Sequence, residues 1–355
     1  MAIKYLSGKR LQGTAAERTA LNISSPTQTS WKEIGRVTLS SNGHTISVTG
    51  LTAKDNIMFL SHQITTGSGR IDGHGTLNGD TGNNYAKREN DNGGSDNVAG
   101  SQATFSTGKG NGTAADNFVV GNILNVASQE KLIITHATGG CAAGAGNVPS
   151  RREAVNKWAN TSDAVSSIQL ISGYAGSSDF AAGSELVVLG CDNDEADSGT
   201  NFWEELVYKD LDSSNLSSGT FAAKKYLMVR LGVYTGGTTD HRLRFNSDGG
   251  SNYANRRTDD GGSDSTDSSQ SSIPYDRSNK DNISTIFIVN KSDKEKFCIS
   301  ETVSEGGSGA GTAPTRREQS FKWANTSAQI TEINLIKNSG SNLASPSFIQ
   351  VFGAD

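Results

Sequence analysis

The feature that most constrains this chain of 355 residues is an internal repeat. The segment Asn78–Asp96 returns as Asn246–Asp264, with 12 of 19 positions identical. A second box, Pro149–Ser162, returns as Pro314–Ser327, with 10 of 14 positions identical. The boxes recur in the same order and at nearly the same distance, so the chain is predicted to contain two copies of one structural unit.

The two copies also begin and end alike. Each begins with a tryptophan, Trp31 or Trp203, and each closes on an apolar run that ends in glycine, at Gly190 or Gly353. A short segment that precedes both copies and holds few apolar residues is expected to anchor on a domain or on a neighbouring protein. The predicted organisation is an N-terminal anchoring segment over 1–30, a first domain over 31–191, a linker over 192–202 and a second domain over 203–355.

Short apolar runs, several with a period of two, predict strands throughout both copies, and no segment shows a sustained helical period. Gly, Asn, Asp and Ser gather between these runs, where they favour turns. The predicted fold is therefore all-β: two tandem jelly-roll-like β-sandwich domains with a short N-terminal extension. The predicted strands are 45–49, 56–64, 118–120, 131–135, 167–171, 185–189, 226–234, 241–245, 284–289, 297–299, 329–336 and 348–352.

The first box contains an Asn-x-Asp-x-Gly-x-Asn-Tyr motif that directly follows a strand. Asx and Gly residues close tight turns, and a tyrosine there would pack beneath the loop with its hydroxyl at the rim. Alternating carboxylates also resemble calcium ligands, but the twelve-residue ligand pattern and its terminal Glu are absent. We favour the turn and expect no metal. The motif residues are Asn78, Asp80, Asn84 and Tyr85 in the first copy and Asn246, Asp248, Asn252 and Tyr253 in the second.

In the second box a tryptophan, Trp158 or Trp323, precedes an Asn-Thr-Ser turn that begins with Asn160 or Asn325. A sugar-stacking platform is one interpretation of this tryptophan. We favour the other, a core side chain that seals the end of the sandwich.

The same box holds the Arg-Arg-Glu clusters 151–153 and 316–318, which include Arg152 and Arg317. These clusters could bind an anionic partner. The adjacent Glu instead favours local ion pairing, which contributes little if it is exposed.

Composition and motifs argue against several function classes. The net charge of -5 gives no electrostatic footprint for nucleic acid or an anionic membrane. No run is long and apolar enough for a membrane span, and the N-terminus lacks the apolar region of a signal peptide. The three cysteines form no disulfide or metal pattern. No histidine pair, nucleophile elbow or phosphate loop is present, so we expect no catalytic residue, no cofactor and no enzyme.

The motif order resembles a domain of tailed-phage structural proteins that occurs in fibres and on capsid surfaces. The second copy carries it as Arg242-Leu-Arg-Phe-Asn246-x-Asp248-x-Gly-x-Asn252-Tyr253, then Trp323-x-Asn-Thr-x-x-Gln-Ile-Thr, then Val351-Phe-Gly353. The resemblance implies a jelly-roll-like sandwich and a role in the virion. The first copy departs from it: Leu77 replaces Phe245, and Gly73-His74-Gly75 is expected to break the preceding strand.

The expected function is a non-enzymatic virion structural protein, a capsid decoration or cement protein or a head-surface appendage of a tailed phage. The alternative is a tail-fibre protein that binds a receptor glycan, which exposed aromatic side chains at the loop tips would favour. A surface hydrolase would need convergent carboxylates in a deep cleft. Expected partners are other virion proteins and further copies of this chain, and a host glycan in the alternative. The expected location is the virion surface, after assembly in the host cytoplasm.

Overall fold

The computed structural model describes residues 31–67, 71–108, 116–173, 178–193, 201–212, 216–235, 239–275, 281–307, 309–340 and 343–355. These residues form strands β1 to β23 and no helix, which confirms the all-β fold class. Within these ranges no helix is long and apolar enough to cross a membrane. The predicted anchoring segment 1–30 lies outside the described residues.

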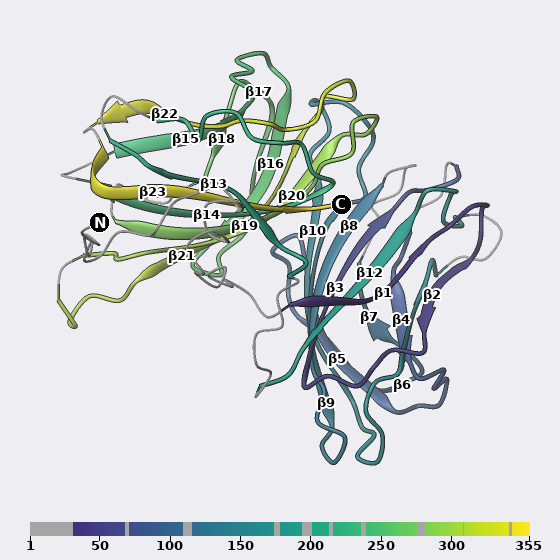
Figure 1. Ribbon diagram of the computed structural model, residues 1–355. Helices are drawn as coiled ribbons and strands as arrows, with labels where there is room; N and C mark the ends of the chain where they lie inside the picture. The colour runs from purple at the N-terminus through teal and green to yellow at the C-terminus, as the bar shows by residue number, and fades with distance from the viewer. Residues whose placement is uncertain are drawn as a thin grey trace, which may run out of the picture.

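The first repeat is a sandwich of two antiparallel sheets (Figure 1). Its large sheet has the order β1-β12-β3-β8-β9-β10-β5-β6, and its small sheet has the order β2-β11-β4-β7. The bounds are β1 Lys32–Thr38, β2 Thr45–Thr49, β3 Asn56–Gln63, β4 His74–Leu77, β5 Tyr85–Asp91, β6 Asn97–Gln102, β7 Phe105–Ser106, β8 Asn117–Leu124, β9 Lys131–Gly139, β10 Ser150–Trp158, β11 Ser167–Ile171 and β12 Glu185–Cys191.

The second repeat has the same strand order in its large sheet, β13-β23-β14-β19-β20-β21-β16-β17. Its small sheet, β18-β15-β22, has three strands, and an isolated bridge from Ser217 to Asn334 takes the place of the β2 pairing. The bounds are β13 Glu204–Asp210, β14 Tyr226–Thr235, β15 Thr239–Phe245, β16 Tyr253–Asp259, β17 Ser265–Gln270, β18 Ile273–Pro274, β19 Asn282–Val289, β20 Lys296–Ser304, β21 Thr315–Trp323, β22 Ile333–Gly340 and β23 Leu343–Ala354.

Each repeat has its own apolar core between its two sheets. Alternate residues along a strand point to opposite faces, so Val119 and Ile123 of β8 point inward and pack with Ile168 of β11. In the second repeat Ile286 and Ile288 of β19 pack with Leu335 of β22 in the same way. Each buried side chain of this size contributes about 1.5–3 kcal/mol to folding.

Four strands lie where the sequence predicted only turns or charged clusters. They are β5 and β16, which begin at Tyr85 and Tyr253, and β10 and β21, which carry the Arg-Arg-Glu clusters. These strands lack a clear apolar alternation because polar residues such as Arg152 and Asn156 occupy their inner face. The strand period was therefore hidden by polar side chains that become buried.

The predicted break at Gly73-His74-Gly75 is wrong, because β4 begins at His74 and pairs with β7. Gly75 lies opposite Phe105, and a Cβ atom on Gly75 would lie 2.4 Å from the phenyl ring. In the second repeat the same pair of positions is Leu243 opposite Ile273. The ring of Phe105 therefore occupies the space that a side chain at position 75 would fill.

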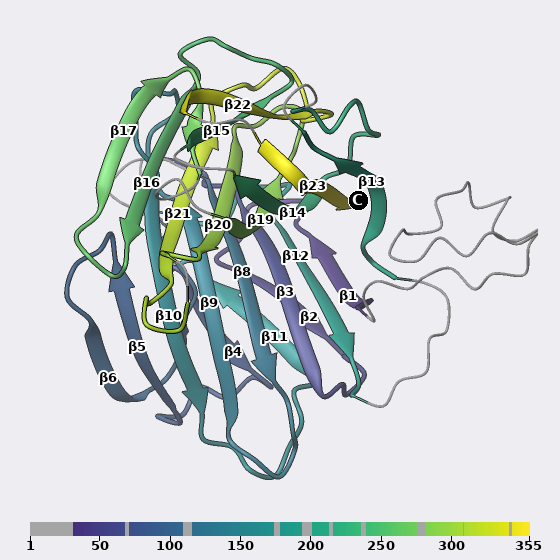
Figure 2. The ribbon, with the colours of Figure 1, turned by 90° about the vertical axis from the view of Figure 1, so that its left-hand side faces the viewer.

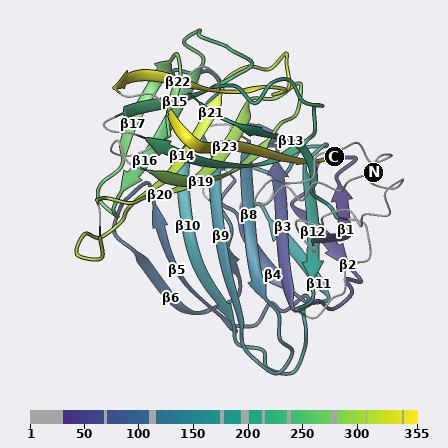
Figure 3. The ribbon, with the colours of Figure 1, turned by 60° about the vertical axis from the view of Figure 1, so that its left-hand side comes forward.

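The two repeats contact each other through the outer faces of their large sheets, the faces that point away from the small sheets. Figures 2 and 3 show the second repeat lying over one end of the large sheet of the first. A third apolar cluster fills this interface. It includes Met58, Leu60, Phe118, Val120, Val187 and Leu189 from the first repeat, and Trp203, Tyr226, Val289, Phe297, Ile299 and Phe352 from the second.

Candidate functional site: the groove between the repeats

The Asn/Asp motif forms a closed turn in the first repeat. The carboxylate of Asp80 accepts hydrogen bonds from the backbone N–H of Gly82 at 2.8 Å and from Nδ2 of Asn84 at 2.9 Å. It also accepts one from Nε1 of Trp158 at 2.6 Å. Partial burial opposes ionisation of Asp80, but the hydrogen bonds from Trp158, Asn84 and Gly82 outweigh it and lower its pKa. The motif thus joins the two repeated boxes.

The second repeat reproduces this turn. Asp248 accepts hydrogen bonds from the N–H of Gly250 at 2.8 Å, from Nδ2 of Asn252 at 2.9 Å and from Nε1 of Trp323 at 2.7 Å. Protein donors therefore surround both carboxylates, as the turn interpretation expects. Within the described ranges, no cluster of three or more His, Cys, Asp or Glu side chains could hold a metal ion.

The motif tyrosine has its hydroxyl buried, and the predicted place at the rim is wrong. The hydroxyl of Tyr85 accepts a hydrogen bond from the N–H of Leu77 at 2.9 Å, and Tyr253 does the same with Phe245 at 2.9 Å. Burial raises the pKa of Tyr85 to about 12. The hydroxyl ties the turn to the preceding strand.

The motif asparagines fasten loops to neighbouring backbone. Oδ1 of Asn78 accepts hydrogen bonds from the N–H groups of Ser166 and Ser167, at 2.7 and 3.1 Å. Oδ1 of Asn160 accepts from the N–H groups of Ser162 and Asp163, at 2.9 and 2.8 Å. Asn246 and Asn325 make the corresponding bonds in the second repeat.

Both motif tryptophans are buried in the core, 1% exposed. Trp158 stacks on Tyr85 with 6.4 Å between ring centroids, and Nζ of Lys131 lies 5.5 Å from its ring. Lys296 lies over Trp323 in the same manner. A buried ring offers no face to a sugar, so the structure favours the sealing role over the stacking platform.

The second arginine of each cluster points into its sandwich, which corrects the picture of exposed local pairing. Arg152 donates to both carboxylate oxygens of Asp91, at 2.5 and 2.8 Å, and Arg317 does so to Asp259 at 2.8 and 3.0 Å. Arg151 pairs with Glu153 of its own cluster, but it also reaches Asp264 of the second repeat at 2.7 Å. These arginines therefore hold strands and repeats together.

A buried polar cluster at the repeat interface escaped the sequence reasoning. The carboxylate of Glu185 accepts a hydrogen bond from the hydroxyl of Tyr226 at 2.9 Å and lies 2.7 Å from Nζ of Lys225. Burial opposes its ionisation, but hydrogen bonds from Lys225 and Thr38 lower its pKa. One signal was available, because the second copy has Phe348 where the first has Glu185.

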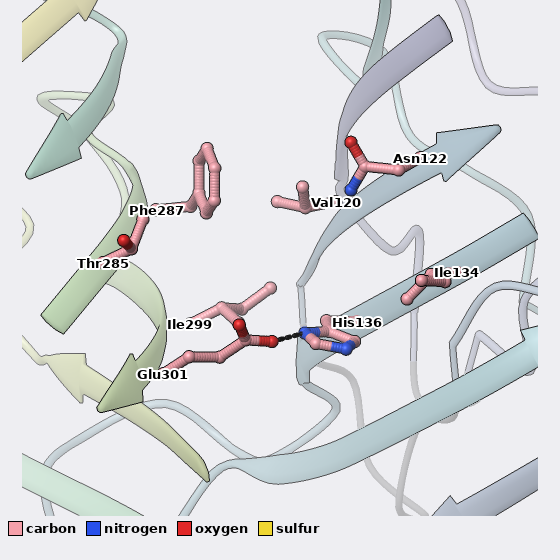
Figure 4. Close-up of a pocket in the computed structure, with 8 residues that line it drawn as sticks. All are labelled: Val120, Asn122, Ile134, His136, Thr285, Phe287, Ile299 and Glu301. Atoms are coloured by element: carbon pink, nitrogen blue, oxygen red, sulfur yellow. Dashed lines mark ion pairs between the residues drawn. The ribbon is translucent and has the colours of Figure 1, made fainter. Parts of the chain in front are cut away.

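A groove opens between the two large sheets at the edge of this interface (Figure 4). His136 of β9 and Glu301 of β20 meet across it, with Nδ1 of His136 and Oε1 of Glu301 2.9 Å apart. The groove has a volume of about 190 Å³. Its lining residues are Val120, Asn122, Ile134, His136, Thr285, Phe287, Ile299 and Glu301. The lining is mainly apolar and contains one ion pair.

The repeated motif residues do not line this groove. Instead, the groove and the polar cluster contain residues that differ between the copies, since His136 and Glu301 occupy the same place in their respective sheets. The copies therefore differ at two of the places where they meet. A comparison of the copies for differences, rather than for identities, could have found these residues.

No family model matches the sequence, and no curated protein matches it. Among solved structures, human GIVD cytosolic phospholipase A2 is similar over 85% of this chain and 33% of that chain, with 6% identity and a TM-score of 0.13. The chain spans about a third of that protein, and a likeness at this TM-score carries no argument about activity.

We expect the His136–Glu301 pair to stabilise the protein in a limited pH range. Burial opposes protonation of His136, but Glu301, Glu153 and Glu318 raise its pKa, so its contribution is complete below pH 6.5 and is lost as the pH rises through the raised value. The hydrogen bond from His136 lowers the pKa of Glu301, so the contribution of Glu301 is complete above pH 4.5 and is lost as the pH falls through the lowered value. Because both groups are partly solvated, the pair is worth less than about 1 kcal/mol.

The measurement is urea unfolding of the wild type and His136→Gln at several pH values. The difference in stability between the two proteins should be largest between pH 4.5 and 6.5 and should shrink above that range. Taking the difference removes the shared contribution of the other histidines. A difference that does not change with pH would show that the pair contributes nothing.

Proposed function

We propose that this chain is a non-enzymatic structural protein of a tailed-phage virion, a capsid decoration or cement protein or a head-surface appendage. The observation that carries the proposal is the use of the repeated motifs. The polar side chains of these motifs close turns and join strands, as Asp80 and Arg152 do. The repeated residues therefore maintain the fold, which is what a structural protein requires. The motif resemblance supplies the virion setting.

The loop tips favour the structural role over the alternative of a glycan-binding fibre. The tips beside the motif turn in the first repeat, 79–84, 125–130 and 159–166, contain no aromatic residue. Stacking of a sugar needs an exposed aromatic ring, and the neighbouring Trp158 is buried. The proposed partners are other virion proteins and further copies of this chain. The proposed location is the virion surface, after assembly in the host cytoplasm.

The test uses particles assembled without this chain, to which the purified full chain is added. We expect the full chain to cosediment with the particles at saturable occupancy, and a variant that lacks residues 1–30 to remain in the supernatant while keeping an all-β circular dichroism spectrum. A full chain that does not bind particles would contradict the virion role. A truncated chain that binds at full occupancy would place the anchor on a sandwich face.

A further inference from the structure

One histidine is buried inside the contact between the two repeats. His62 of β3 lies on the outer face of the first large sheet, between Glu185 of β12 and Phe118 of β8 in the strand register. Its side chain is 0% exposed, and among the described residues neither ring nitrogen has a hydrogen-bond partner. Because a buried polar group without a partner costs free energy, the imidazole weakens the contact rather than strengthening it.

The sandwich fold does not require a histidine at this position. The equivalent cross-strand pair in the second repeat is Gly232 and Phe348, and the ring of Phe348 fills the space beside Gly232. Neither of these two residues titrates. The ionisable pair of His62 and Glu185 is therefore specific to the first repeat, where it faces the second.

The two acids beside His62 already have other cations. Glu185 lies 3.2 Å from Arg36, and it also pairs with a lysine of the second repeat. Oδ2 of Asp116 lies 3.9 Å from Nε2 of His62, beyond hydrogen-bond range, whereas it lies 3.4 Å from Nζ of Lys294. A proton on the imidazole would therefore gain no hydrogen bond from either carboxylate in the closed arrangement.

The second repeat surrounds His62 with positive charge. Three of its lysines face the imidazole across the contact: Lys225, Lys291 and Lys294. Burial is the main cause that holds the pKa of His62 well below its ordinary value, and the three lysines add to it. An imidazolium would be one more positive charge beside the apolar side chains that fill the contact, so protonation opposes the contact.

We propose that His62 is an acid-operated release for the contact between the repeats: uptake of a proton by its imidazole opens the contact while both sandwiches stay folded. Each repeat has its own apolar core between its two sheets, so neither core depends on the contact. The inference rests on the geometry of the contact and does not depend on the proposed virion role.

The direction of the pH dependence follows from proton binding. In the open chain water reaches the imidazole, and its pKa returns to about 6.5. The closed chain, in which that pKa is lowered, then binds fewer protons than the open chain. The closed state therefore has its full stability above pH 6.5 and loses it as the pH falls below that value, by up to about tenfold in the ratio of open to closed chains per pH unit.

Two other groups at the contact act in the opposite direction. His136, with its partner Glu301, and Asp116, whose pKa is raised by burial, both bind protons more tightly in the closed chain. Both groups remain in a variant that changes only His62. The difference between the wild type and such a variant therefore isolates the effect of His62.

The experiment measures how fast dithiodipyridine modifies Cys141 in the full chain, with peptide mass spectrometry to resolve the cysteines. Cys141 is buried in the apolar cluster of the contact, whereas Cys298 is buried in the core of the second repeat. When the contact recloses faster than the reagent reacts, the rate is proportional to the open fraction. We expect the rate at Cys141, relative to that in His62→Phe, to rise about tenfold between about pH 7.5 and about pH 5.5, and Cys298 to stay protected.

His241→Gln is the matched control, because His241 is also 0% exposed but lies in β15, in the small sheet of the second repeat. It should keep the acid response of the wild type. His62→Gln repeats the test with a second side chain that does not titrate, should His62→Phe fail to fold.

Three results would overturn the inference. The first is a rate at Cys141 that changes with pH equally in the wild type and in the His62 variants. The second is a rate at Cys298 that rises together with that at Cys141, because acid would then unfold the second repeat rather than open the contact. The third is an acid response that His241→Gln abolishes.

Discussion

Gly75→Leu is expected to destabilise the protein by about 3 kcal/mol, at the upper end of the cost of overpacking a core. The cause is Phe105, whose ring atoms lie 2.4 to 2.9 Å from where a Cβ atom on Gly75 would be. In the first repeat the ring of Phe105 packs on the motif tyrosine, Tyr85, with 6.1 Å between ring centroids. In the second repeat the ring that packs on Tyr253 belongs to Phe245, with 6.2 Å between centroids. The two cores fill one space from different strands.

The triple exchange Gly75→Leu, Leu77→Phe and Phe105→Ile introduces the residues that the second repeat has at the three equivalent positions. The exchange replaces the clashing ring of Phe105 with a smaller side chain, but the three substitutions together add side-chain volume to the core. We therefore expect the triple variant to recover part of the loss and to be more stable than Gly75→Leu in urea unfolding. Gly100→Leu, at a glycine of β6 with open space around it, is the control and should have little effect. A triple variant no more stable than Gly75→Leu would show that the two cores are not interchangeable.

Arg152→Met is expected to destabilise the protein by about 3 kcal/mol, because it removes the buried guanidinium that pairs with Asp91 and Glu89. Arg152 is 5% exposed; besides Asp91, it lies 3.4 Å from the carboxylate of Glu89, which is itself buried. Burial opposes ionisation of Glu89, but Ser106 and Arg152 hold its pKa below the usual value. Without the guanidinium, Lys87 remains 3.0 Å from Oε1 of Glu89, so the buried carboxylate keeps one of its two cations.

The matched control is Arg316→Met in the corresponding cluster of the second repeat. Its side chain is 59% exposed and pairs with Glu318 at 3.0 Å, so the loss should not exceed about 1 kcal/mol. Urea unfolding at neutral pH measures both variants, and Glu89→Gln added to Arg152→Met should recover part of the loss. Equal losses for the two arginines would show that burial of Arg152 has no energetic consequence.

Local patterns predicted the strands whose two faces differ in polarity. Thr45–Thr49 alternates apolar and polar residues, and it forms β2 with its apolar side chains in the core. Ser150–Trp158 has no such pattern, and its strand was missed. Both faces of that strand carry polar groups, which become buried only through partners such as Asp91 and Asp264 that lie far away in the sequence.

The motif boxes were recognised as turns, but their connection was not. Asp80 and Trp158 are far apart in the chain, and only the pairing of β5 with β10 brings their side chains within hydrogen-bond distance. The place of the Tyr85 hydroxyl depended on the same packing. Proximity along the chain can therefore indicate a turn, whereas its side-chain partners depend on which strands become neighbours.

The sequence by itself determined that the chain contains two copies of an all-β unit, because repeated residues and a period of two are properties of the chain alone. Only the tertiary structure decided how the copies meet, because the sequence of a strand does not show whether water or another sheet covers its outer face. Leu132 and Phe297 show this: both are apolar at the same position of their strands, yet one is exposed and the other is buried. The difference arises from the contact between the two large sheets, which no pattern within one repeat contains.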